Sequence, residues 1–391
     1  MASYILHLPK WFPNEDDNLE GVFVLRHIQC SSYKHSAKII YLKSTSRVIP
    51  DSFYYSDFKV QGSNEIHLIY YRKSYLGINS IDKIIKLFVY YYLLFKFCSK
   101  LFKKFGKPYA IHVHVLLRSA LVALYYKIVY SVPYLVTEHS TQFTDSHSRL
   151  KNDFKNLIRK LVVKKAAAII VVSDNLRIGM LRYGLINSNY LVVYNNVDTL
   201  VYYEKPKSPI QELKCLHVSE FKNEHKNITG ILEVMILFKH EAFPILLDLV
   251  GYGQDEQLIQ DFITQNKLES QVRLLGKMDP IDLARCYQEA DVFILFSNKE
   301  NMPCVIAESL CCGTPVISTE VGGTGEVISS ANGILIPVND KVKLKKALED
   351  FYLNRHNYSS INISMDAISK FSDRAIGEKI MKCYESLSHC G

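Results

Sequence analysis

The sequence predicts an α/β protein made of two doubly wound domains, and three observations support this. Apolar runs of strand length alternate with helical stretches in both halves of the chain, as in parallel sheets covered by helices. The length of 391 residues exceeds what one ordinary hydrophobic core holds. A polar stretch with two prolines, residues 203–212, separates the halves. We therefore expect domains over residues 1–202 and 203–373.

The first half opens with the strand Y-I-L-H-L, a loop that ends at Gly21, and a helix. Later apolar runs predict further strands, which read A-K-I-I-Y-L, E-I-H-L-I-Y-Y, Y-A-I-H-V-H-V, Y-L-V-T-E-H, A-A-A-I-I-V-V-S and Y-L-V-V-Y-N-N-V-D-T. The second half restarts the pattern with C-L-H-V-S, I-L-L-D-L-V-G-Y-G, Q-V-R-L-L-G, D-V-F-I-L-F and P-V-I-S-T. The chain then ends in a helix within residues 374–391.

Two carboxylates bracket the junction between the strand D-V-F-I-L-F-S and the next helix. Glu300 lies on the loop after that strand, where open α/β sheets place ligands, and Glu308 lies about two turns into the helix. Pro303 suits the start of this helix, and Gly313 suits its end. Free N–H groups at a helix N-terminus can hold a phosphate, and carboxylates accept strong hydrogen bonds from sugar hydroxyls. This arrangement suits a sugar nucleotide.

The string E-N-M-P-C-V-I-A-E-S-L-C-C-G-T-P-V resembles the signature of the family-4 retaining glycosyltransferases of GT-B fold. The string Y-N-N-V-D resembles the P-N-G-V-D segment of that family, with Tyr194 and Asn196 in place of Pro and Gly. The resemblance implies two Rossmann-like domains that face a cleft, the first on the acceptor side and the second binding the donor. It also implies that the final helix crosses back to the first domain.

The resemblance assigns roles to the residues around the two acids. Glu300 would bind the donor sugar and stabilise the transition state, and Glu308 would hold the ribose hydroxyls. Backbone N–H groups would hold phosphate and sugar oxygens, and they come from Asn301, Met302, Cys304 and Val305. The first domain offers no clear carboxylate nucleophile for a double displacement, which favours a same-face mechanism in which the leaving phosphate accepts the acceptor's proton.

Lys226 lies in H-V-S-E-F-K-N-E-H-K-N-I, between a strand and a helix. A lysine there can offset the charge of a leaving diphosphate. The related enzymes carry an arginine before this lysine, and Glu220 stands at that position here. Lys222, from the same loop, is the candidate replacement. The alternative for Lys226 is a solvated loop lysine.

Further positions of the donor site follow from the resemblance. His139, at the end of Y-L-V-T-E-H, would face the donor sugar, although a packed core histidine is the alternative. Gly21 would let the first loop approach the diphosphate. Gly251 and Gly253 would line the nucleotide pocket, and Lys277 and Met278 would lie beside the base. Gly322 and Gly323 would shape the turn after P-V-I-S-T-E-V.

No metal site is expected, and no cofactor beyond a UDP- or GDP-linked sugar. The chain has no D-x-D motif, and a lysine with a helix terminus can carry the phosphate charge. His112 and His114 point to the same face of one strand, but a metal site there is a weak hypothesis because no acid or cysteine accompanies them.

The net charge of +8 is unevenly distributed. Residues 83–107 hold seven lysines and no acid, with Phe and Leu between them at helical spacing. This pattern predicts a basic amphipathic helix that contacts an anionic membrane, and an ordinary surface helix is the alternative. A second basic stretch covers residues 149–165. No nucleic-acid recognition motif accompanies the charge, so we expect no nucleic-acid partner.

The nine cysteines show no C-x-x-C pair, which indicates a reduced cytosolic protein. No signal peptide or spanning segment is evident, so we expect a cytoplasmic protein at the inner face of the cell membrane. The prediction is a hexose transferase acting on a lipid-linked or polysaccharide acceptor, for instance in lipopolysaccharide or capsule synthesis. The alternatives are an inactive scaffold of a polysaccharide assembly and an NAD-dependent oxidoreductase.

Overall fold

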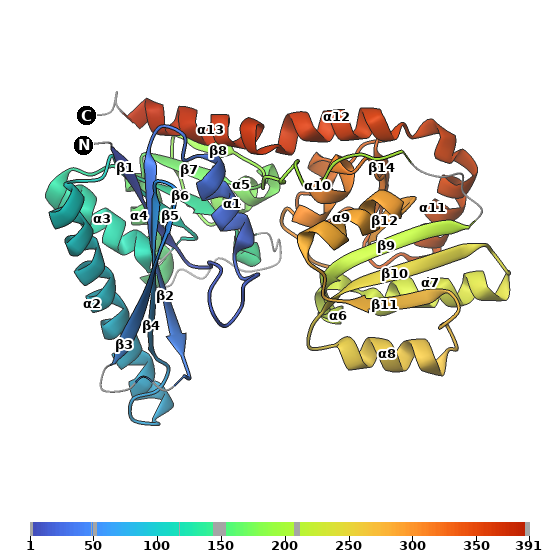
Figure 1. Ribbon diagram of the computed structural model, residues 1–391, viewed down its shortest axis with the longest axis horizontal. Helices are drawn as coiled ribbons and strands as arrows, with labels where there is room; N and C mark the ends of the chain where they lie inside the picture. The colour runs from blue at the N-terminus through green and yellow to red at the C-terminus, as the bar shows by residue number, and fades with distance from the viewer. Residues whose placement is uncertain are drawn as a thin grey trace. The chain divides into compact units, whose positions relative to one another are not determined.

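The structure is a computed structural model that describes residues 3–47, 49, 53–116, 118–143, 154–206 and 212–387. The predicted segments 149–153, 207–211 and 388–391 lie outside these residues. The chain forms two compact units, which Figure 1 draws as ribbons. The first unit comprises Met1–Val172, Arg177–Val193 and Ile376–Gly391, and the second comprises Ser173–Leu176 and Tyr194–Ala375.

The first unit is built on one sheet whose described strands run in the order β3-β4-β2-β1-β5-β6-β7-β8. All neighbouring pairs are parallel except β3 and β4. The strand order reverses between β1 and β5, which makes that pair the topological switch point of the sheet. The strands are β1 (Tyr4–Pro9), β2 (Ser36–Thr45), β3 (Tyr54–Gln61), β4 (Asn64–Arg72), β5 (Ala110–His114), β6 (Tyr134–Glu138), β7 (Ala168–Val171) and β8 (Tyr190–Val192).

Helices cover both faces of this sheet, with α2 and α3 along one face and α1 on the other (Figure 1). All residues of β1, β5, β6 and β7 are buried, as expected for parallel strands covered on both sides. The helical elements are α1 (Val22–Cys30), α2 (Asn79–Phe105), α3 (Ser119–Tyr130), η1 (Thr141–Phe143), α4 (Phe154–Lys165), α5 (Asp174–Arg182) and α13 (Asp373–Ser386).

The sequence did not predict β3, which pairs antiparallel with β4 through a turn at Gly62. Most of its side chains are exposed or half-buried, because it is an edge strand. Its pattern of apolar residues is therefore weak, and only the pairing with β4 reveals it.

The second unit contains a parallel sheet whose described strands run in the order β11-β10-β9-β12-β13-β14. This is the Rossmann order, with its switch point between β9 and β12. The strands are β9 (Leu213–Glu220), β10 (Ile245–Tyr252), β11 (Val272–Gly276), β12 (Val292–Leu295), β13 (Val316–Thr319) and β14 (Gly333–Ile336). The short strand β14 was also missed from the sequence. The predicted α/β fold class, with two doubly wound sheets, is confirmed.

The hydrophobic core of the second unit lies between its inner strands and the helices that flank the sheet. Side chains of β9, β10 and β12 pack with α7, and the carboxyl-terminal part of the core includes α11. The helical elements are α6 (Asn223–Lys226), α7 (Ile228–His240), α8 (Glu256–Gln265), α9 (Pro280–Glu289), α10 (Cys304–Cys311), η2 (Thr324–Glu326), α11 (Lys341–Asn354), η3 (Arg355–Asn357) and α12 (Ser360–Phe371).

The boundary between the units differs from the one that the sequence suggested. The structure assigns residues from Tyr194 onward to the second unit, whereas the sequence placed the boundary after residue 202. Val197 forms a β-bridge with Ser372, and Tyr202 is buried against the ring of Tyr287. Composition marks where a chain becomes polar, but it does not tell which core a preceding apolar residue joins.

Candidate functional site

The candidate site of the second unit lies where β9 and β12 end, at the switch point of its sheet. The loop after β9 leads into α6, which carries Lys226 at its end, and the loop after β12 carries Glu300. Because β9 and β12 are parallel neighbours, their carboxyl ends meet at one edge of the sheet. The topology therefore brings together two charged residues that are 74 positions apart in the sequence.

Glu300 and Lys226 form an ion pair in a largely buried setting. Lys226 Nζ donates to Glu300 Oε1 at 2.6 Å, and the side chains are 19% and 8% exposed, respectively. Ser297 Oγ, which is fully buried, donates to the same oxygen at 2.7 Å. Within the described residues, Glu300 Oε2 accepts no hydrogen bond. The carboxylate is thus held through one oxygen and retains the other as an acceptor for a ligand hydroxyl.

The loop after Glu300 is held by contacts from several segments of the second unit. Asn301 Oδ1 accepts a hydrogen bond from Ser173 Oγ at 3.0 Å, and the Asn301 carbonyl accepts one from Gly323 N–H at 2.6 Å. Asn195 Nδ2 donates to the carbonyl of Met302 at 3.1 Å. These contacts fix the loop before any ligand arrives, which is the condition for a preorganised site.

Glycine is required where the loop that follows β13 approaches Glu300. Gly322 has φ of 61°, and a Cβ at this position would lie 2.3 Å from the carbonyl oxygen of Glu300. At Gly323, a Cβ would lie 2.9 Å from the carbonyl oxygen of Asn301. The predicted turn is therefore a close backbone approach that supports the loop bearing the acid.

Helix α10 starts at Cys304 with Pro303 as its N-cap residue, so the helix begins one residue later than Pro303. The first N–H groups of an α-helix have no acceptor in a preceding turn, so the start of α10 is suited to bind an anion. Glu308 follows on the same helix and is 6% exposed. Burial and the nearby Glu308 charge raise the pKa of Tyr287 well above its ordinary value.

Lys222, Gly251 and Gly253 lie at or just after the ends of the neighbouring strands β9 and β10. Lys222 precedes α6, and its ammonium group has no hydrogen bond or ion pair with the described residues. Gly251 has φ of 144°, and a Cβ there would lie 1.9 Å from Ser219 O, so this glycine allows a close approach between the ends of β10 and β9. At Gly253, a Cβ would lie 2.6 Å from the carbonyl oxygen of Phe221.

Lys277 and Met278 follow β11, which is two strands away from β9. Lys277 Nζ lies 4.8 Å from the ring centroid of Tyr252, and Met278 Sδ lies 3.5 Å from Cys286 Sγ. No contact joins them to Glu300 within the part of the chain that the structure describes. Their assignment to the base remains a prediction.

His139 and Gly21 belong to the first unit. His139 follows β6 and is 8% exposed, with its ring centroid 4.9 Å from that of Phe23 and 5.3 Å from that of His27. The preceding Glu138 carboxylate accepts hydrogen bonds from the N–H groups of Leu116, His139 and Ser140. Burial raises the pKa of Glu138. This buried acid fixes the loop that carries His139.

Gly21 is the N-cap residue of α1 and has φ of 67°. A Cβ there would lie 2.4 Å from the carbonyl carbon of Trp11, so the first loop closes tightly on itself at this glycine. This geometry explains the glycine without reference to a ligand. A contact of Gly21 with a diphosphate remains a prediction.

The sequence did not indicate Ser297, Ser173 and Asn195, although each donates a hydrogen bond to the loop around Glu300. Ser297 directly follows the apolar run of β12, and a short polar residue at a strand end was the available signal. Ser173 and Asn195 are distant in sequence, and only the fold brings them here.

His217, within β9, is a further buried polar residue of this region. Its Nδ1–H donates to the carbonyl of Ile294 at 2.9 Å, and its Nε2 accepts from Ser219 Oγ at 2.8 Å. Burial lowers the pKa of His217 to about 4, the Ile294 carbonyl opposes this shift, and the nearby Lys226 charge adds to it. The ring is therefore neutral at pH 7.

We expect His217 to make the second unit less stable in acid. Between pH 6.5 and 4 the unfolded chain binds a proton at this position and the folded chain does not, so stability falls as the pH falls through this window. The full loss is about 3 kcal/mol, from the size of the shift. Urea unfolding of wild type and His217→Gln at pH 7 and pH 4.5 measures it. The acid-induced loss should shrink in His217→Gln and persist in His240→Gln, which changes an exposed histidine of the same unit.

The chain matches two family models that together span most of its length. Residues 203–364 match the glycosyl transferases group 1, and residues 72–200 match glycosyltransferase family 4. An N-acetyl-alpha-D-glucosaminyl L-malate synthase from Bacillus anthracis is 27% identical over 292 residues, which cover 71% of this chain and 73% of that protein. The O-antigen chain mannosyltransferase B of Escherichia coli is 30% identical over 119 residues, which cover 29% and 30%.

Solved structures match over almost the whole chain. A sucrose-phosphate synthase from Thermosynechococcus elongatus superposes with a TM-score of 0.76 at 19% identity, covering 99% of this chain and 100% of that one. HepE from Anabaena, solved in complex with UDP, gives a TM-score of 0.70 at 15% identity, with the same coverage. At these identities the structural likeness establishes the fold alone.

These matches exclude the oxidoreductase alternative and favour a glycosyltransferase enzyme over a binding scaffold. The two family models cover parts of both units, residues 72–200 and residues 203–364. The chain therefore belongs to the family-4 glycosyltransferases of GT-B fold.

Proposed function

We propose that this glycosyltransferase moves a hexose-type sugar from a UDP- or GDP-linked donor to a lipid-linked or polysaccharide acceptor, with retention of configuration. The observation that carries the proposal is that only one of the two carboxylate oxygens of Glu300 accepts hydrogen bonds from the described residues. One of its oxygens is held by Lys226 and Ser297, and the other accepts no hydrogen bond from the described residues. A sugar hydroxyl is the ligand that this free oxygen suits.

The charges around Glu300 fit a leaving diphosphate next to a sugar that becomes positive. Lys226 supplies a cation, the N-terminus of α10 supplies N–H groups, and Lys222 supplies a second cation that is free among the described residues. Glu300 supplies the negative charge that stabilises an oxocarbenium-like transition state. Glu308, farther along α10, holds the ribose hydroxyls.

The reaction that we propose occurs on one face of the sugar. The leaving phosphate, held by Lys226 and α10, accepts the proton of the acceptor hydroxyl as that oxygen bonds to the anomeric carbon. This keeps the configuration without a covalent enzyme intermediate, whereas double displacement needs a carboxylate on the far face of the sugar. His139, which belongs to the first unit, is proposed to hydrogen-bond a hydroxyl group of the donor sugar.

The names of similar proteins support the donor and acceptor classes. HepE from Anabaena was solved with UDP and with UDP-glucose, and a similar Bacillus anthracis protein is named N-acetyl-alpha-D-glucosaminyl L-malate synthase. Other similar proteins are named for colanic acid, O-antigen and lipopolysaccharide core synthesis. These names favour a cell-surface glycan or its lipid-linked precursor as the acceptor.

Ligand-observed NMR with a panel of UDP- and GDP-sugars tests the donor assignment. We expect selective binding of one donor, and at least a tenfold loss of affinity in Glu308→Ala, because the ribose loses a charge-assisted hydrogen bond. The matched control is Glu233→Ala, which removes an exposed acid of α7 in the same unit. Equal donor binding by Glu308→Ala and wild type would contradict the ribose role. The anomeric configuration of the product then tests retention.

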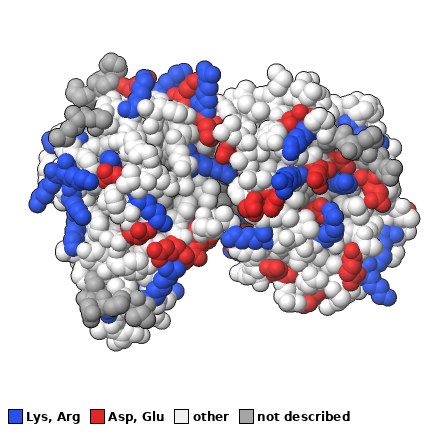
Figure 2. All heavy atoms as spheres, viewed as in Figure 1, with Lys and Arg blue, Asp and Glu red and all other residues white. Residues whose placement is uncertain are grey.

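We also propose that α2 contacts an anionic membrane at the inner face of the cell. This helix exposes several large apolar side chains, and the most exposed are Ile84 at 58% and Phe88 at 73%. Lys83 and Lys86 lie among them, and neither lysine has an ion pair with a described residue. Figure 2 shows lysine and arginine side chains at the edge of the first unit where Figure 1 draws α2 and α3.

A helix that combines exposed apolar and basic side chains is suited to lie in a membrane interface, with its lysines near anionic headgroups. Across the described residues, the structure has no helix that is long and apolar enough to cross a bilayer. An interfacial contact of α2 would place the enzyme beside a lipid-linked acceptor.

Vesicle sedimentation tests this contact. Removing two lysines near the membrane costs about 2 kcal/mol of binding, so Lys83→Ala/Lys86→Ala should bind vesicles containing phosphatidylserine about 30-fold more weakly than wild type. The matched control, Lys343→Ala/Lys346→Ala, removes two exposed lysines with the same spacing from α11 and should bind as wild type. Equal loss in both variants would indicate a general charge effect and would refute the role of α2.

A further inference from the structure

Three buried histidines gather at the switch point of the first sheet. His7 lies on β1, and His112 and His114 lie on the neighbouring β5. The strand register pairs His7 with His112 and Pro9 with His114, so all three side chains point to the same face of the sheet. Each side chain is at most 1% exposed. His7 was not recognised from the sequence, because only strand pairing brings it to the other two.

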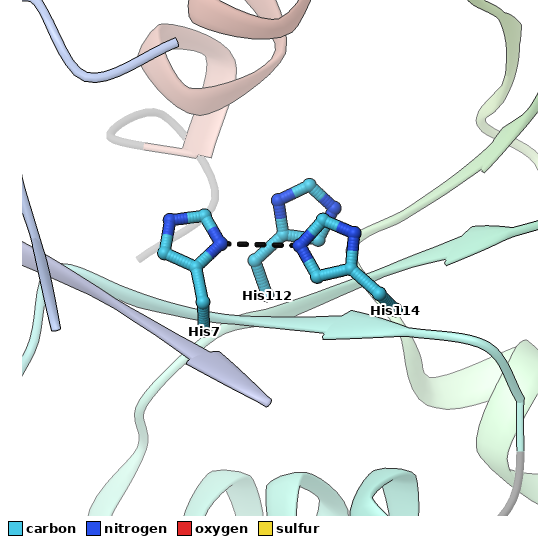
Figure 3. Close-up of side chains that lie close together, drawn as sticks. All are labelled: His7, His112 and His114. Carbon is cyan, nitrogen blue, oxygen red and sulfur yellow. Dashed lines mark hydrogen bonds between the residues drawn. The ribbon is translucent and has the colours of Figure 1, made fainter. Parts of the chain in front are cut away.

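The ring nitrogens are close enough to share one ion. His7 Nδ1 lies 3.2 Å from His114 Nε2, and one nitrogen from each of the three rings falls within 4.8 Å of the others. Figure 3 shows the rings of His7 and His114 directed toward each other, with the ring of His112 behind them. Two nitrogens that bind one tetrahedral zinc ion, each at about 2.0–2.1 Å, lie about 3.3 Å apart.

We propose that His7, His112 and His114 form a binding site for a divalent transition metal of the zinc class. Imidazole nitrogens suit zinc, copper, nickel and iron rather than magnesium or calcium, which prefer oxygen ligands. The site would join the two central strands of the first unit. None of its three ligands is among the residues proposed to bind the donor.

The surroundings provide the hydrogen bonds that orient metal-bound histidines. His112 Nδ1 lies 2.6 Å from Tyr384 Oη, and His112 Nε2 lies 2.6 Å from Thr137 Oγ1. When a metal binds one ring nitrogen of His112, the hydrogen bond at that nitrogen is lost. The hydrogen bond at the other nitrogen remains and orients the ring. His114 Nδ1 is buried and has no hydrogen-bond partner among the described residues.

The rings are neutral in the folded protein, and each therefore offers a lone pair. Burial lowers the pKa of His7, His112 and His114 far below the ordinary range. The strand register and the short distances bring the three nitrogens together whatever their protonation. Three protein ligands leave a fourth position, which water or a neighbouring hydroxyl group can fill.

The site borders a residue of the proposed catalytic group. The ring centroid of His139 lies 6.1 Å from that of His114, with the two planes inclined by 19°. A metal at the three histidines would place positive charge close to His139. It would also link β1 to β5 through shared ligands, close to where these strands lead into the loops that follow them.

Metal analysis of the whole protein, purified without a polyhistidine tag, tests the proposal. After chelator treatment and incubation with Zn²⁺, we expect one zinc per chain by mass spectrometry, and a melting temperature higher by about 5–10 °C at a hundredfold excess over the dissociation constant. His7→Gln and His114→Gln should each weaken zinc binding at least about tenfold, since loss of even an outer hydrogen-bond partner costs this much. His217→Gln, which changes a buried histidine of the second unit, should bind as wild type.

Wild-type protein alone supplies a second test in case the variants do not fold. X-ray absorption of the zinc-loaded protein should show nitrogen ligands at about 2.0–2.1 Å with the outer scattering of imidazole rings. Co²⁺ in place of zinc should give the visible absorption of a tetrahedral ion. Less than one tenth of an equivalent of zinc, an oxygen-rich octahedral spectrum, or equal binding by His7→Gln and wild type would each overturn the proposal.

Discussion

Glu300→Gln is expected to lower turnover by about 10²–10³-fold or more while leaving donor binding nearly unchanged. Glutamine keeps the size of the side chain and can still accept a hydrogen bond from a donor hydroxyl. It loses the negative charge that would stabilise the positive sugar in the transition state. It also leaves Lys226 without the carboxylate that now lies 2.6 Å from its ammonium group. Because these losses fall on the transition state, kcat should fall and KM should change little.

Steady-state kinetics with the donor identified by NMR measures this effect. Glu233→Gln is the matched control, because Glu233 is an exposed acid of the same unit that also pairs with a lysine, Lys341. The control should retain full activity, since an exposed ion pair contributes little and lies on α7. Turnover by Glu300→Gln within twofold of wild type would remove this residue from the mechanism. A fall in donor affinity of the same size as the fall in kcat/KM would make it a binding residue only.

Gly322→Ala is expected to reduce activity strongly without unfolding the protein. The added Cβ would lie 2.3 Å from the carbonyl oxygen of Glu300, and φ of 61° is a conformation that alanine rarely adopts. The loop that bears Glu300 must therefore shift, and a shift of about 1 Å at a catalytic group can cost about 10²-fold in rate. We also expect a loss of stability of about 1–2 kcal/mol from the left-handed conformation.

Gly325→Ala is the matched control in the same loop. Its Cβ would meet neighbours at 3.6 Å or more, which is ordinary contact, and Gly325 is not among the glycines with positive φ. Kinetics and thermal melts of both variants separate the local effect from the global one. Gly325→Ala should behave as wild type in both measurements. If Gly322→Ala lost activity only in proportion to its folded fraction, the glycine would support the fold and not the position of Glu300.

Several elements were predictable from the sequence for simple physical reasons. The buried strand β12 is a continuous apolar run, because a parallel strand covered on both faces has no solvent-exposed side. The loop of Glu300 was placed correctly after its strand, since Pro303 and Gly313 mark the limits of the helix that follows. These signals are local in the chain.

Other features have no local signal. The edge strand β3 alternates only weakly, and the pairing with β4 reveals it. Tyr194 to Tyr202 read as part of the first half, yet their contacts lie with the second unit. Ser173 and Asn195 support the loop of Glu300 from more than 100 positions away in the sequence. No spacing rule connects such residues.

The α/β class, the two doubly wound halves and the two acids at a strand–helix junction could be predicted from the chain alone, because each depends on the order of nearby residues. Which groups meet depends on the folded chain. Lys226 contacts one oxygen of Glu300, Gly322 lies against the Glu300 carbonyl group, and His7 lies beside His112 and His114. The reason is that parallel strands bring distant segments to one sheet edge, and their order in the sheet differs from their order in the chain.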